Sequence, residues 1–116
     1  MNIEQMLNTL ACLAVIAFGV YAIGKPRAAA QLAGLGMVSP KGVAEIRITF
    51  GMLSLALGAA PLLLNQQAAY QTVGIVFLGA LVMRVVAVFL DRPRLDRGYI
   101  ISGVFELIVG LILFLV

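Results

Sequence analysis

Four charged residues lie inside segments that are otherwise apolar and long enough to cross a membrane. Glu45 and Arg47 lie in the second such segment, Arg84 in the third and Glu106 in the fourth. Side chains of these types can form ion pairs or bind an anionic ligand, and the glutamates can also exchange protons. An unpaired charge at the bilayer centre costs about 2.5–3.5 kcal/mol on insertion scales. The sequence therefore predicts that the four charges compensate one another or form a working site.

The composition indicates that these charges are carried by membrane helices. Hydrophobic residues make up 63% of the 116 residues and charged residues 11%, against about 45–50% and about 25% in soluble domains. The apolar runs are continuous rather than alternating, which excludes the strands of a membrane barrel. We expect one all-α domain over 1–116, a bundle of four transmembrane helices at about 4–24, 40–64, 68–90 and 98–116.

Capping and turn residues mark the ends of these helices. Ser39 and Pro40 form a typical N-cap and first-turn pair that opens the second helix. The polar segment 65–67 links the second helix to the third. In the first connection, the segment 26–35 is compatible with a short helix on the membrane surface, ended by a glycine.

The basic residues indicate the orientation. They concentrate in the connections after the first and third helices, whereas the 65–67 link and the C-terminus carry none; the residues are Lys25, Arg27, Lys41, Arg92, Arg94 and Arg97. By the positive-inside rule, these two connections face the cytoplasm, with both termini outside and four antiparallel crossings. The net charge of +3 is then a topology signal, with membrane lipids as partners and no role in nucleic-acid binding.

Depth along the helices places the four charges at a similar level. From the cytoplasmic ends, Glu45 lies about 9 Å, Arg47 about 12 Å, Arg84 about 10 Å and Glu106 about 13 Å into its helix. Two acidic and two basic groups make a set that is neutral overall. We therefore expect one intramembrane polar cluster, contributed by three helices.

Pairing in that cluster must run between helices. Glu45 and Arg47 lie about 200° apart around the helix axis and do not face each other. We expect Glu106 to pair with Arg47 or Arg84, and Glu45 to pair with the other arginine. Thr49 and Ser102, each about one turn from a glutamate, are candidates for further hydrogen bonds in the cluster.

Small residues around the charges predict close helix packing. In the second helix, Gly51, Ser54 and Gly58 continue a stripe that begins at Arg47, and in the fourth helix Gly103 and Gly110 flank Glu106. Stripes of small residues let neighbouring membrane helices approach closely.

A short repeat relates the two halves of the chain. The segment 42–46 reads GVAEI and the segment 103–107 reads GVFEL, and a Pro-Arg pair precedes each one. The halves are then candidates for two repeated helical hairpins, related by an axis along the membrane normal.

These residues carry a family resemblance that spans nearly the whole chain. The pattern is the segment 44–51 (AEIRITFG), Leu57-Gly58, Arg84, Asp91-Arg92-Pro93, and Glu106 with Gly110. It resembles an uncharacterised bacterial family of four-helix membrane proteins, domain-of-unknown-function family 4345, which is similar in architecture to DoxX-like proteins. One departure is Arg92, where the family pattern has glycine. The resemblance implies the fold and a location in the bacterial inner membrane, and it supplies no activity.

Two classes of function remain open. Enzymatic activity, a cofactor and a metal site are not expected, because the chain has no histidine, a single cysteine at Cys12 and no Gly-rich phosphate loop. In the first class the protein is a structural or accessory membrane subunit, in a homo-oligomer or a larger complex, and the Glu/Arg cluster is a polar clasp. In the second, the cluster binds a small anionic or amphipathic molecule or transports it with protons.

Overall fold

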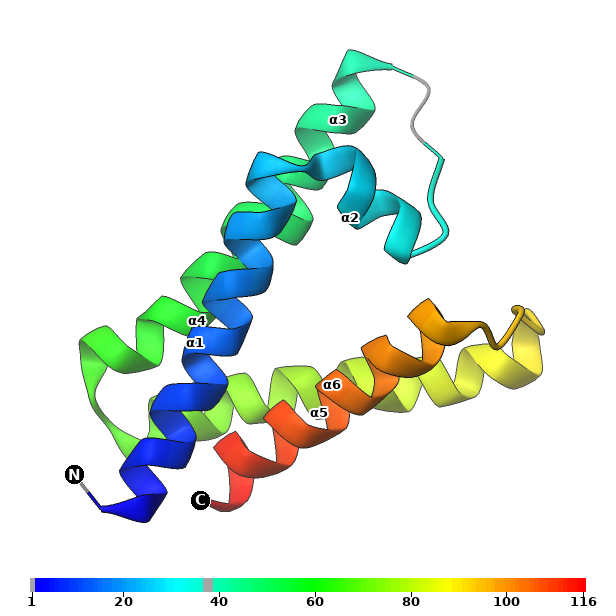
Figure 1. Cartoon of the computed structure of the whole chain (residues 1–116). Helices are drawn as coiled ribbons and strands as arrows, with labels where there is room; N and C mark the ends of the chain where they lie inside the picture. The colour runs from blue at the N-terminus through cyan, green and yellow to red at the C-terminus, as the bar shows by residue number, and fades with distance from the viewer. Residues whose placement is uncertain (1, 37–38) are drawn as a thin grey trace.

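The computed structural model of the chain describes residues 2–36 and 39–116, and within these ranges it contains five helices and no strand. The first two are α1 (Ile3–Gly24) and α2 (Pro26–Leu32). The third is continuous over Pro40–Leu64 and comprises α3 (Pro40–Ile46), the π-helical segment η1 (Arg47–Met52) and α4 (Leu53–Leu64). The last two are α5 (Gln67–Leu90) and α6 (Arg97–Leu115) (Figure 1).

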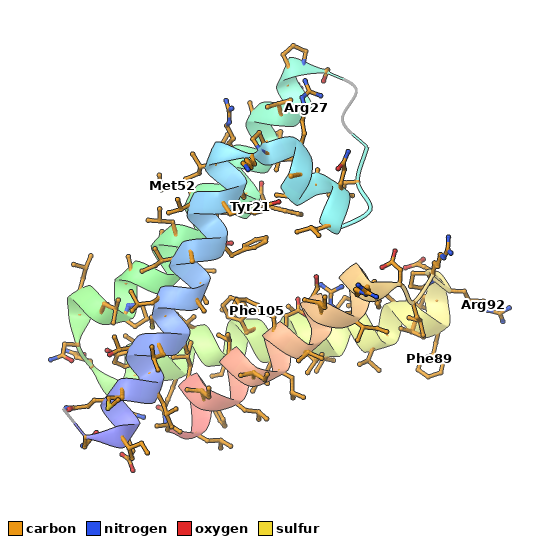
Figure 2. The ribbon with its side chains drawn as sticks, in the orientation of Figure 1. Tyr21, Arg27, Met52, Phe89, Arg92 and Phe105 are labelled. Atoms are coloured by element: carbon orange, nitrogen blue, oxygen red, sulfur yellow. The ribbon has the colours of Figure 1, made fainter. Side chains whose placement is uncertain are left out.

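Four of these helices are long and apolar enough to cross a membrane, namely Ile3–Gly24, Pro40–Leu64, Gln67–Leu90 and Arg97–Leu115. The expectation of an all-helical chain with four membrane-length helices is therefore confirmed. Between 11% and 33% of the residues in their apolar windows are buried. In Figure 2 the side chains of Met52 and Phe89 project away from the ribbon, and they are 53% and 77% exposed. Apolar surface on this scale indicates a multi-pass membrane protein.

Polar residues lie at the boundaries of the helices, where the polar connections meet the apolar segments. The side chain of Asn2 accepts a hydrogen bond from the Gln5 backbone N–H at 2.8 Å, and Gln5 Oε1 accepts one from the Asn2 backbone N–H at 3.2 Å, which makes a capping box. Ser39 Oγ accepts a bond from the Gly42 N–H at 3.2 Å, which confirms the predicted N-cap. At the other end of that helix, Asn65 adopts the left-handed conformation, with φ 51°.

The helices associate as two pairs. In the first pair α1 packs on η1 and α4, and in the second α5 packs on α6. Figure 1 shows the two pairs diverging from the end of the molecule where both termini lie. The short helix α2 returns from the end of α1 toward the start of α6, where the backbone oxygen of Leu32 lies 2.8 Å from the position of a Cβ on Gly98.

Glycines set the close approach within each pair. A Cβ on Gly19 would lie 2.6 Å from the Gly51 carbonyl oxygen, and one on Gly58 would lie 2.7 Å from the Cys12 carbonyl oxygen. In the second pair, a Cβ on Gly74 would lie 2.7 Å from the Phe114 nitrogen. These backbones are too close for any side chain between them, as is typical of membrane helix pairs.

The apolar core lies where the two pairs meet. Its buried residues come from α1, α5 and α6, and they are Ala11, Cys12, Val15, Val73, Val109 and Leu113. This core is at the end of the molecule that carries the termini. Among the described residues, this cluster does not extend to the opposite ends of the two pairs, where Glu45, Arg47, Arg84 and Glu106 lie.

Candidate functional site

Arg84 and Glu106 form an ion pair between α5 and α6. Arg84 Nε donates to Glu106 Oε1 at 2.7 Å, and Arg84 Nη2 donates to Glu106 Oε2 at 3.0 Å. The two side chains are 27% and 12% exposed. This bidentate geometry is the strongest that an arginine and a carboxylate can adopt. Both carboxylate oxygens of Glu106 therefore have a charged donor within the α5–α6 pair.

Tyr99 completes this arrangement from the first turn of α6. The guanidinium carbon of Arg84 lies 4.9 Å from the centroid of the Tyr99 ring. The Tyr99 hydroxyl donates to the backbone carbonyl oxygen of Arg84 at 2.8 Å. The sequence reasoning did not identify Tyr99, although it precedes Glu106 by two helical turns and so shares its face. We call Arg84, Glu106 and Tyr99 the Arg84 clasp.

The local sequence explains how these three side chains meet. Asp96 Oδ1 accepts a bond from the Tyr99 backbone N–H at 3.0 Å and so begins α6 just before the tyrosine. Gly103 lies between Tyr99 and Glu106 on the same face, and a Cβ there would be 3.3 Å from Arg84 Cδ. The absence of a side chain at Gly103 lets the stem of Arg84 lie along α6.

Arg47 has a backbone partner instead of a carboxylate. Its Nε donates to the carbonyl oxygen of Ile23 at 3.0 Å. Ile23 lies in the last turn of α1, where carbonyl oxygens have no partner within the helix. Pro26, three residues after Ile23, has no N–H to offer this turn. Arg47 therefore ties η1 to the end of α1.

Glu45 lies in α3 and is exposed. Within 2–36 and 39–116 it makes neither an ion pair nor a side-chain hydrogen bond, so the expected pairing of Glu45 with an arginine is not made. Figure 1 shows the reason: α3 lies at the far end of the first pair, away from α5 and α6. Equal depth along two helices does not bring side chains together when the helices diverge.

The structure thus joins two of the four predicted charges and leaves the other two apart. Of the two partners expected for Glu106, it selects Arg84 rather than Arg47. Thr49 is exposed and Ser102 is partly buried, and neither side chain has a hydrogen bond in the described part of the chain.

The small residues that we expected at helix contacts are not all buried in such contacts. Gly51 and Gly58 are buried against α1, and Gly110 is buried against Leu78 of α5. Gly103 contacts Arg84, as described above, and Ser54 is partly buried. The sequence reasoning missed Gly19, whose backbone meets that of Gly51, although the small residues Cys12, Gly19 and Ala22 share one face of α1 and could have marked its contact face.

The chemistry available at the Arg84 clasp is limited by its own pairing. The described residues contain no group of three or more carboxylate, thiol or imidazole side chains that could hold a metal ion. Two cavities of about 280 Å³ each lie elsewhere in the molecule, and neither is lined by Arg84 or Glu106. An arrangement in which donor and acceptor groups are matched within the chain is suited to holding helices together.

Comparison with known proteins identifies no relative: no protein-family model matches the chain, and neither a curated protein nor a solved structure does. The resemblance to domain-of-unknown-function family 4345 therefore stays a prediction. The geometry of the Arg84 clasp and the exposure of Glu45 and Arg47 are the features of this chain that bear on its function.

Proposed function

We propose that this chain is a multi-pass protein of the bacterial inner membrane that acts as a structural or accessory subunit. The observation that carries this proposal is the bidentate pair of Arg84 and Glu106, closed on one side by Tyr99. Each of the two charges has its counter-charge within the chain, so a charged substrate would have to compete with that partner. Its role is to fix the register of α5 against α6.

The membrane topology is part of the proposal. Four antiparallel crossings with both termini outside would put the basic connections around α2, and between α5 and α6, on the cytoplasmic side. Arg27 and Arg92, labelled in Figure 2, belong to these two connections. Membership of domain-of-unknown-function family 4345 agrees with this placement and is proposed with it.

The proposed role as a subunit depends on Glu45. In the membrane this exposed carboxylate would lie about 9 Å into its helix, at a depth where a carboxylate without a partner is costly. Because Glu45 forms no ion pair among the described residues, a second chain or a lipid headgroup can supply its counter-charge. A homo-oligomer or a larger membrane complex would provide the cation from a neighbouring subunit.

Melting of the purified protein in detergent tests the clasp. Glu106→Gln removes the charge and leaves the shape, so it should lower the melting temperature. Glu45→Gln is the matched control and should leave the melting temperature of the monomer unchanged. A Glu106→Gln protein that melts with the wild type would rule out the clasp.

Assembly in native-like membranes tests the subunit role. We expect the wild type to form cross-linked or co-purified assemblies in membrane nanodiscs, and Glu45→Gln to form fewer of them. If the wild type is monomeric under every lipid composition, or if Glu45→Gln assembles equally well, the subunit role is wrong.

Binding or proton-coupled transport of a small anionic or amphipathic molecule is the second candidate, and the exposure of Arg47 favours it. Nε of Arg47 is bound to Ile23, but its Nη atoms have no hydrogen bond to any residue of 2–36 or 39–116. They can receive a phosphate or carboxylate group. This candidate predicts that an anionic amphiphile raises the melting temperature of the wild type and not that of Arg47→Leu. Release of protons on addition of the amphiphile would distinguish transport from binding.

A further inference from the structure

A polar cavity of about 280 Å³ lies at the end of the molecule opposite to the Arg84 clasp. It is formed where the first turns of α1 meet the connection between α4 and α5. Its lining residues are all polar and uncharged, five carboxamides and one phenol: Gln5, Asn8, Asn65, Gln66, Gln67 and Tyr70. The Arg84 clasp and the exposed charges of the first pair do not contribute to it.

Asn8 is the residue that indicates a ligand. It is 5% exposed, and it is the only polar or charged residue in the described part of the chain that is classed as buried. Its Oδ1 atom is fully buried and has no hydrogen-bond partner among the described residues. A buried acceptor without a donor is destabilising, and an apolar residue would fill the same place without that cost. Because the Asn8 side chain also lines the cavity, a donor supplied from outside the chain resolves the mismatch once the carboxamide turns its oxygen toward that space.

The cavity is larger than a single water molecule requires. Water takes about 30 Å³ in the liquid, and sites for small molecules begin at about 300 Å³. The walls are also held in place before any ligand arrives. The capping box of Asn2 and Gln5 fixes the start of α1, and Gln67 Nε2 donates to the backbone oxygen of Val116 at 3.2 Å. The space therefore suits a compact ligand about the size of a monosaccharide.

The chemistry of the lining selects the class of ligand. A charged ligand would find no counter-charge here, because none of the lining side chains is ionised. A carboxamide both donates and accepts hydrogen bonds, as the hydroxyl groups of a polyol do, and Tyr70 adds an aromatic ring with a hydroxyl. We propose that this cavity binds a neutral polyol of monosaccharide size, with one ligand hydroxyl donating to Asn8 Oδ1.

The same polyol chemistry can come from a free sugar or from a glycolipid headgroup. Ile3, Leu63 and Leu64 lie beside the cavity in the sequence and are 71%, 83% and 63% exposed. In a membrane these side chains would reach the acyl chains while the cavity lies at the headgroup level. The experiment therefore needs one arm for each source.

Isothermal titration of the full chain tests the proposal, in a detergent without a sugar headgroup, such as an alkyl amine oxide. The probes are D-glucose in one arm, and glucosyl-diacylglycerol against plain diacylglycerol in the other. We expect saturable binding of glucose or of the glucolipid, weakened about tenfold or more by Asn8→Leu, since one hydrogen bond to a buried group is lost. Gln31→Leu, on an exposed position of α2 outside the cavity, is the matched control and should bind as the wild type does.

Two further variants keep the test decisive if Asn8→Leu does not fold. Tyr70→Phe and Gln66→Ala each remove a polar group from the lining and should each weaken binding severalfold. Binding of glucose alone would indicate a free sugar, and binding of the glucolipid alone a headgroup. No saturable binding of either probe, or equal binding by all cavity variants, would overturn the proposal and leave water as the only occupant.

Discussion

The guanidinium group of Arg47 donates through Nε to the backbone carbonyl oxygen of Ile23, 3.0 Å away, and so closes the end of α1 from a different helix. A positive group at a helix C-terminus also interacts favourably with the helix dipole. One charged side chain in η1 thereby satisfies a carbonyl group that has no partner within its own helix. This contact joins the two helices of the first pair at the end opposite to the apolar core.

Replacement of Arg47 by leucine should free the end of α1. We expect Arg47→Leu to destabilise the protein by about 0.5–1.5 kcal/mol, the usual contribution of one hydrogen bond. Amide hydrogen exchange should rise at residues 21–25, where the last turn loses its tie. Arg27→Leu removes a nearby exposed arginine and serves as the control. Equal exchange in the two variants would show that the Ile23 contact does not hold the helix end.

Arg84 should not tolerate lysine. Lysine keeps the positive charge but cannot present two parallel donors to Glu106. We expect Arg84→Lys to lower stability by about 1–2 kcal/mol, because a charged hydrogen bond is lost, and denaturation in mixed micelles measures the change. Arg97→Lys, at an exposed position at the start of α6, is the matched control. If the two substitutions lower stability equally, the bidentate geometry does not contribute to stability.

Reversal of the pair tests whether Arg84 and Glu106 act on each other. Arg84→Glu and Glu106→Arg should each be destabilising alone, since each places two like charges together. The double variant should be more stable than the sum of the two single effects allows, by an interaction energy of about 0.5–3 kcal/mol. A double-mutant cycle in detergent measures this energy. Additive effects would mean that the two side chains are energetically independent.

The two contacts of Tyr99 can be separated by substitution. Tyr99→Phe removes the hydroxyl bond to the Arg84 carbonyl and keeps the ring, so we expect a loss of about 0.5–1.5 kcal/mol. Tyr99→Leu also removes the aromatic ring and its cation–π contact with Arg84, so we expect it to lower stability by about 0.5–1 kcal/mol more. Thermal melting of both variants beside Tyr21→Phe, an exposed tyrosine on α1, provides the comparison. The order of stability should be wild type, then phenylalanine, then leucine.

Glycines that look alike in the sequence should respond in opposite ways to alanine. Gly58→Ala places a Cβ 2.7 Å from the Cys12 carbonyl oxygen, so α1 and α4 must separate. Gly79→Ala meets nothing within 4 Å and should be neutral or stabilising, because alanine favours a helix over glycine by about 1 kcal/mol. The yield of folded protein and the melting temperature measure the effect of each substitution. A Gly58→Ala protein as stable as Gly79→Ala would contradict the close packing of the first pair.

Local features of this protein could be predicted without the structure. The apolar runs predicted four membrane-length helices, and Ser39 predicted the start of one of them, because both signals act between residues that are close in the chain. Gly51, Gly58 and Gly110 were recognised as contact residues from their spacing alone. Gly19 was not, because whether a single glycine faces a neighbour depends on which helix lies beside it.

The sequence by itself determined how far Glu45, Arg47, Arg84 and Glu106 lie from the ends of their apolar helices, since that distance follows from residue count and helical rise. Only the tertiary structure decided their partners. It joined Arg84 to Glu106 and added Tyr99, gave Arg47 the Ile23 carbonyl, and left Glu45 exposed. The physical reason is that ion pairing acts over a few ångströms across helices, and the divergence of the two helix pairs sets those lateral distances.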